Sequence, residues 1–115
     1  MNCKFLSVAT FDRELKRLSK KYKSLKRDIE NLKAEIEINP LLGTDLGEGY
    51  KKIRLASKNK GKRGGGRVIT HEVLVNVNEE DETRNILFAV IYDKSEYDTV
   101  DMDIVKEIVQ EYYSE

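Results

Sequence analysis

The spacing of apolar residues in the first third of the chain predicts a short strand and then helices. Residues 3–8 are a short, mixed apolar run that fits a strand. After it, apolar side chains recur every three or four positions, as they do along one face of a helix, at Phe11, Leu15, Leu18, Tyr22, Leu25, Ile29, Leu32 and Ile36. We expect helices over residues 10–22 and 24–38, with Thr10 and Ser24 as N-caps. Because no Gly or Pro interrupts this pattern, a single long helix is the alternative.

Beyond residue 50 the apolar pattern has a period of two, which is typical of strands. In the first such segment, Ile53 and Leu55 would face one side of a strand, and Lys52 and Arg54 would face the other. The alternation therefore separates a candidate core face from a basic face on the same strand.

Two longer strands and a final helix follow. Residues 67–77 are predicted as a strand, and an acidic turn at 79–82 separates them from residues 85–92. That second segment is almost wholly apolar, which predicts a central strand buried on both faces. Residues 100–113 place apolar side chains on one helical face. The order β-α-α-β-β-β-α predicts one α+β domain over residues 1–115, in which the helices pack on one face of a small antiparallel sheet.

Positive charge is concentrated in residues 50–69. The chain has 21 basic and 21 acidic residues, yet this run contains no acid and eight bases: Lys51, Lys52, Arg54, Lys58, Lys60, Lys62, Arg63 and Arg67. Such sorting of charge is typical of a site for polyanions, phosphodiester backbones above all. The alternative interpretation is a solvated, flexible hairpin whose lysines only keep it soluble.

The rest of the composition limits the classes of function. No apolar run approaches the roughly 18 residues that a membrane span requires, and the N-terminus does not resemble a signal peptide. Cys3 is the only cysteine, so an intrachain disulfide is excluded. His71 is the only histidine and is expected to be a strand residue with a satisfied hydrogen bond. One Cys, one His and scattered acids lack the ligand spacing of a metal site, and we expect a cytoplasmic protein without a cofactor.

Three basic side chains can converge on one phosphate. Lys52 and Arg54 project from the same strand face, and Arg67 opens the next strand after the glycines at 64–66. If the two strands pair as a hairpin, these side chains meet, and Arg can bind phosphate bidentately while Lys supplies a mobile charge. The spacing around the glycines does not fit a P-loop, so nucleotide hydrolysis is not expected.

Tyr92 and Lys94 close the apolar strand and lie two positions apart, so they point to the same side of it. Both residue types can transfer a proton in catalysis. The alternative is that Tyr92 only caps the core with its hydroxyl in water.

One set of segments stands out in its order along the chain: residues 11–18 (FDRELKRL), 20–22 (KKY), 24–26 (SLK), 39–40 (NP), 52–56 (KIRLA), 61–69 (GKRGGGRVI) and 91–96 (IYDKSE). Together they resemble the RelE/ParE superfamily of type II toxin–antitoxin toxins, and most closely its RelE/HigB-like branch. The resemblance spans nearly the whole chain and implies two N-terminal helices on an antiparallel sheet. It also implies a ribosome-dependent endoribonuclease, or mRNA interferase, that cuts mRNA on the ribosome and is held inactive by a cognate antitoxin protein.

The resemblance further implies a chemistry and a set of residues. In this family the ribose 2′-OH attacks the adjacent phosphate, which leaves a 2′,3′-cyclic phosphate and a free 5′-OH. The positions that match its catalytic groups are Lys52, Arg54, Arg67, Tyr92 and Lys94, with Tyr97 as another candidate for a late tyrosine. Cations expected to hold ribosomal RNA or flanking phosphates are Lys51, Lys58, Lys60, Lys62 and Arg63.

Two other functions use the same features. ParE-like members of the superfamily inhibit DNA gyrase by binding, without nuclease chemistry, and a non-enzymatic nucleic-acid adaptor would use the basic hairpin for phosphate contacts only. The segment from Asp93 onward is strongly acidic, so the last helix could fold over the basic face and partly screen it.

Overall fold

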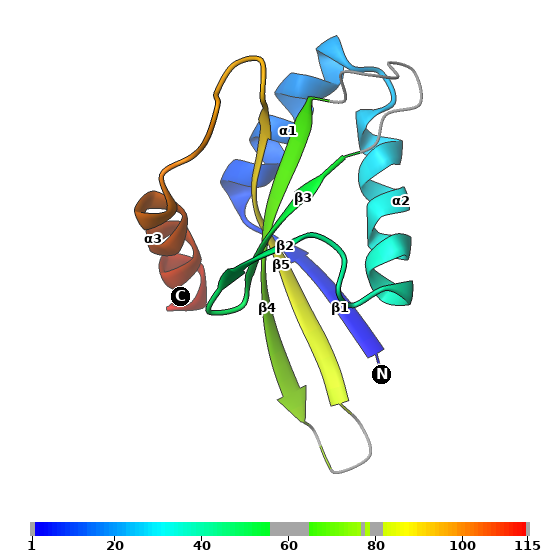
Figure 1. Cartoon of the computed structure of the whole chain (residues 1–115), viewed down its shortest axis with the longest axis vertical. Helices are drawn as coiled ribbons and strands as arrows, with labels where there is room; N and C mark the ends of the chain where they lie inside the picture. Colours follow the sequence, from blue (N-terminus) through cyan, green and yellow to red (C-terminus); the bar gives the residue numbers. More distant parts are fainter. Residues whose placement is uncertain (1, 56–64, 77, 79–81, 115) are drawn as a thin grey trace.

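The computed structural model describes residues 2–55, 65–76, 78 and 82–114. Within them the chain is an α+β protein with three helices and a five-stranded mixed sheet. The elements are β1 (Asn2–Ser7), α1 (Ala9–Lys21), α2 (Leu25–Ile38), β2 (Thr44–Gly47), β3 (Tyr50–Arg54), β4 (Gly66–Asn76), β5 (Glu82–Asp93) and α3 (Met102–Tyr113). The strand order in the sheet is β1-β5-β4-β3-β2 (Figure 1).

The sheet is mixed, and the prediction of an antiparallel sheet is wrong for its first strand. The strands β3, β4 and β5 pair antiparallel in series, as predicted. However, β1 runs parallel to β5, from Asn2 opposite Thr83 to Ser7 opposite Phe88. Two helices lie between β1 and the rest of the sheet in the sequence, so no hairpin restricts its direction.

The strand β2 was absent from the prediction. It pairs antiparallel with β3, and its sequence TDLG has a single large apolar residue, so it carries no alternation that could identify it. The turn that follows has positive φ at Gly47, Glu48 and Gly49. Glycine is the residue that adopts this backbone conformation without strain, which explains two of the three positions.

The helices cover both faces of the sheet, which corrects the prediction that they share one. Phe11 of α1 packs edge-to-face on Phe88 of β5, with 5.4 Å between ring centroids. Leu87, the residue before Phe88, pairs with His71 of β4, and His71 contacts Tyr113 of α3. Since successive strand residues point to opposite faces, α3 lies on the face opposite α1 (Figure 1). The prediction failed because β5 is apolar on both faces and gives no indication of which helix covers which.

The two N-terminal helices are separate, as expected, but their starts differ from the prediction. α1 begins at Ala9 with Val8 in the N-cap position, so Thr10 lies inside the helix. Ser24 does precede α2, but its hydroxyl donates to the Asp28 carboxylate (3.1 Å) and makes no cap hydrogen bond. α1 ends where Tyr22 becomes extended and its hydroxyl reaches β5.

One buried arginine links the elements on the α1 and α2 side. The Arg84 guanidinium donates to both carboxylate oxygens of Glu72, at 2.9 and 2.8 Å, and to the carbonyl of Ile36 at 3.2 Å. It therefore joins β5 to β4 and to the end of α2. Among the helices described, none is long and apolar enough to cross a membrane.

Candidate functional site

Three of the predicted site residues form a row across adjacent strands. Arg54 of β3 pairs with Arg67 of β4, and Arg67 pairs with Tyr92 of β5. Side chains in such pairs lie on the same face with about 4.5–5.5 Å between Cβ atoms. Lys52 is on the same face of β3, two residues from Arg54, and pairs with Ile69. We call Lys52, Arg54, Arg67 and Tyr92 the cross-strand row.

The alternation in β3 aims the basic side chains as the sequence predicted. Ile53 and Leu55 are buried in the core, with exposed fractions of 3% and 4%. Because their neighbours point the other way, Arg54 is exposed and Lys52 is half-buried on the opposite face. This is the face that α3 covers further along, since Arg67 and His71 share it on β4.

Tyr92 is the most buried member of the row, with 3% of its surface exposed. Burial raises the pKa of Tyr92 above its ordinary value of 10.0, and the positive charge of Arg67 lowers it by a smaller amount. The phenol therefore holds its proton at neutral pH and is a hydrogen-bond donor. Arg67 is half-buried, and one of its terminal nitrogens donates to the carbonyl of Gly66 at 3.1 Å.

Lys94 lies just past the end of β5, in an exposed turn. Its backbone N–H donates to the carbonyl of Gly65 at 2.8 Å, which extends the β4–β5 pairing to the base of the turn. The Lys94 side chain is thus at the same end of the sheet as the cross-strand row.

Asp93 holds this turn in place, and the sequence reasoning did not identify it. Its carboxylate is 2% exposed and accepts hydrogen bonds from the Tyr22 hydroxyl at 2.5 Å and the Ser95 N–H at 2.9 Å. The Lys21 ammonium lies 3.6 Å away. Burial by itself would raise the pKa of Asp93, but the two hydrogen bonds and Lys21 outweigh it and hold the pKa below 3.8. The only signal in the sequence is an acid at the end of an apolar strand, which is too common to be informative.

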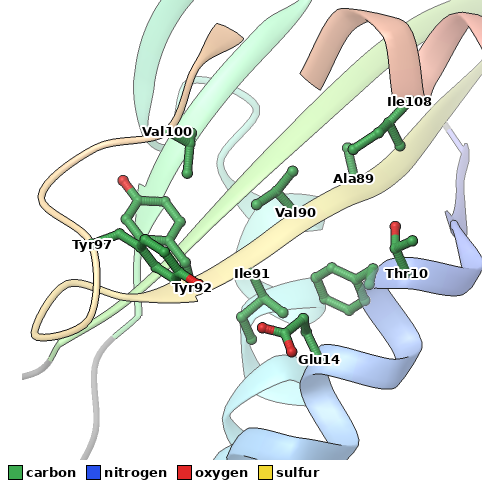
Figure 2. A pocket seen from close by; sticks show the side chains of 10 residues that line it. Thr10, Glu14, Ala89, Val90, Ile91, Tyr92, Tyr97, Val100 and Ile108 are labelled. Atoms are coloured by element: carbon green, nitrogen blue, oxygen red, sulfur yellow. The ribbon is translucent and has the colours of Figure 1, made fainter. Parts of the chain in front are cut away.

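A narrow cleft of about 210 Å³ opens beside Tyr92. Its wall is mainly apolar and comes from α1, β5, the segment before α3 and α3 itself. Figure 2 shows Tyr92 and Tyr97 together at one end of the cleft and Ile108 at the other. Tyr97 is 52% exposed, so the second candidate tyrosine is the accessible one of the pair.

The structure does not bring every predicted residue to this end of the sheet. Lys51 is on the opposite face of β3, where its ammonium donates to the carbonyl of Pro40. The remaining cations proposed for RNA or ribosome contacts lie outside the described residues: Lys58, Lys60, Lys62 and Arg63.

His71 is a strand residue with satisfied hydrogen bonds, as predicted. Its Nε2 lies 3.1 Å from the carbonyl of Glu48, and its Nδ1 lies 3.3 Å from the Tyr113 hydroxyl. Nε2 therefore carries the proton and donates to the carbonyl, while Nδ1 accepts from the tyrosine. The described part of the chain contains no cluster of three His, Cys, Asp or Glu side chains that could hold a metal ion.

The last helix shares a sheet face with the cross-strand row, but its described contacts are elsewhere on that face. Tyr113 packs against His71, and the Lys106 ammonium lies 3.0 Å from the Glu48 carboxylate. The acid nearest the row's end of the sheet that has a described ion pair is Glu96, which binds Arg17 of α1 at 2.8 Å. Screening of the basic face by α3 remains a prediction.

No known protein-family model matches this chain.

Proposed function

We propose that this chain is a RelE-like toxin that cleaves mRNA on the ribosome by transesterification. The observation that carries the proposal is the cross-strand row, in which two arginines, a lysine and a protonated tyrosine share one end of one sheet face. A binding surface for phosphates requires only the cations. The buried tyrosine beside them favours chemistry at the phosphate.

The reaction has three requirements. The 2′-OH must lose its proton as its oxygen bonds to the adjacent phosphorus, the phosphorane must be stabilised, and the 5′ oxygen must gain a proton as its bond to phosphorus breaks. Arg54 and Arg67 are suited to the second requirement, because guanidinium groups stay charged and donate to two phosphate oxygens at once.

Proton transfer falls to the other residues. Since Tyr92 keeps its proton at neutral pH, it is suited to be the general acid for the 5′ oxygen. Lys52 on the same face or Lys94 at the end of β5 would take the proton from the 2′-OH. The burial of Tyr92 requires RNA to approach through the cleft beside Tyr97, or the segment before α3 to move on binding.

The same burial favours one alternative. If the 94–100 segment keeps Tyr92 covered, the exposed cations bind phosphate without cleavage, and the chain is a nucleic-acid-binding module.

Expression of the chain in a bacterium, followed by primer extension on abundant transcripts, separates these functions. The proposal predicts growth arrest with discrete cuts in translated mRNA, and loss of the cuts in an Arg67→Ala variant that remains folded. Growth arrest with intact transcripts and altered supercoiling would indicate gyrase inhibition, and absence of toxicity would favour the binding module.

A further inference from the structure

The edge of β4 continues past its neighbour and has no described strand beside it. The β3–β4 pairing ends at Tyr50 opposite His71, and the Glu72 N–H then donates to the carbonyl of Gly49 at 3.0 Å. From there to Asn76, β4 pairs only with β5 (Figure 1). Because hydrogen-bonding directions alternate along an antiparallel strand, the backbone groups of Leu74 and Asn76 point outward from the same edge as those of Glu72.

This free edge is apolar in a strongly charged protein. Val73, Leu74 and Val75 are consecutive, and their exposed fractions are 37%, 53% and 38%. Natural proteins usually protect such edges with charged residues, Pro, bulges or short strands. None of these devices occurs from Val73 to Asn76.

The outer edge strand of the same sheet shows the usual protection. β2 has four residues, it carries Asp45, and its pairing is interrupted by a register shift between Asp45 and Gly47. The free edge of β4 therefore differs from β2 in each device that prevents strand pairing, which is what an edge used for pairing requires.

From these features we infer that the free edge of β4 is a dimer interface, on which a second copy of this chain pairs antiparallel about Leu74. In this register Leu74 lies opposite its own copy, and Val73 lies opposite Val75 of the second copy. Glu72 lies opposite Asn76, so no like charges meet. A two-fold pairing of this kind uses the same surface on both copies and leaves no free edge for further addition. The inference rests on the edge alone and does not depend on the proposed nuclease activity.

Sedimentation equilibrium of the full chain over a range of concentrations tests this interface. We expect a reversible dimer whose dissociation constant rises about tenfold or more in Leu74→Glu, because the two new carboxylates would be directly opposite. Within one copy the new carboxylate would lie beside Arg84, its cross-strand neighbour, so the fold is retained and is checked by urea unfolding. Ile104→Glu is the matched control, since Ile104 is 55% exposed and lies on α3, and it should leave the dimer unchanged.

Cross-linking tests the register. In a Cys3→Ser background, Leu74→Cys should form an intermolecular disulfide efficiently, because directly opposed residues have Cα atoms about 4.5–5.5 Å apart. Ile104→Cys should not. A wild-type chain that is monomeric at all concentrations would overturn the inference, as would a dimer that withstands Leu74→Glu or cross-links no better through position 74 than through position 104.

Discussion

The carboxylate of Asp93 offers a direct test of how the candidate site is held, through the substitution Asp93→Asn. The side chain is 3% exposed and accepts two hydrogen bonds, from the Tyr22 hydroxyl and the Ser95 N–H. Hydrogen bonds to a charged group contribute about 1.5–3 kcal/mol each, and an amide oxygen keeps part of that. Lys21 adds little, because its side chain is largely exposed. We therefore expect a loss of about 2 kcal/mol in the free energy of unfolding at neutral pH.

The pH dependence of this loss is the stricter test. The folded-state pKa of Asp93 lies below its ordinary value, so its contribution is fully present above pH 3.8 and is lost as the pH falls through the folded pKa. The difference in unfolding free energy between wild type and Asp93→Asn should accordingly shrink as the pH is lowered through that range.

Urea unfolding followed by circular dichroism at a series of pH values measures this difference. Asp98→Asn serves as the control, since Asp98 is exposed and should show no loss at any pH. A loss that is the same at acidic and neutral pH would refute the assigned role of the charge, and so would no loss at all.

Two other predictions concern the frame of the fold. Arg84→Met should lower the free energy of unfolding by about 3 kcal/mol, because it leaves the Glu72 carboxylate without its buried partner, whereas Arg17→Met at an exposed ion pair should leave the urea midpoint almost unchanged. Equal effects of the two substitutions would contradict this account of the buried pair. Gly49→Ala should destabilise the protein more than Gly47→Ala in a thermal melt, since both have φ near +90° but a methyl group at Gly49 would lie 2.9 Å from the Glu72 carbonyl oxygen, while at Gly47 it meets nothing within 4 Å. Similar melting temperatures for the two variants would show that the close approach is relieved at little cost.

Local patterns predicted the elements and the orientation of the basic residues. The alternation of Ile53 and Leu55 with Lys52 and Arg54 was sufficient to aim the cations away from the core, and the structure confirms it. The apolar run that became β5 was correctly predicted as central and buried on both faces. These features follow from side-chain period and burial, which are local properties of a sequence.

The parts that failed depend on contacts between distant segments. The parallel direction of β1 and the position of α3 are set by packing across β5, whose two apolar faces offer no distinction in the sequence. The role of Asp93 depends on Tyr22, 71 residues earlier in the chain, and no local pattern joins the two. The same holds for the placement of Tyr92 beside Arg67, which the sequence suggested only through a resemblance and which the strand register specifies.

The rate of mRNA cleavage in a purified translation system tests the central claim most directly. The wild-type chain should cut mRNA on the ribosome, and Arg67→Ala should cut at least about a hundredfold more slowly, because a guanidinium that stabilises the phosphorane is lost. Lys51→Ala, on the opposite face of the sheet, should retain most of the rate. An unchanged rate in Arg67→Ala, or no cleavage by the wild-type chain, would contradict the assignment of a nuclease site to the cross-strand row.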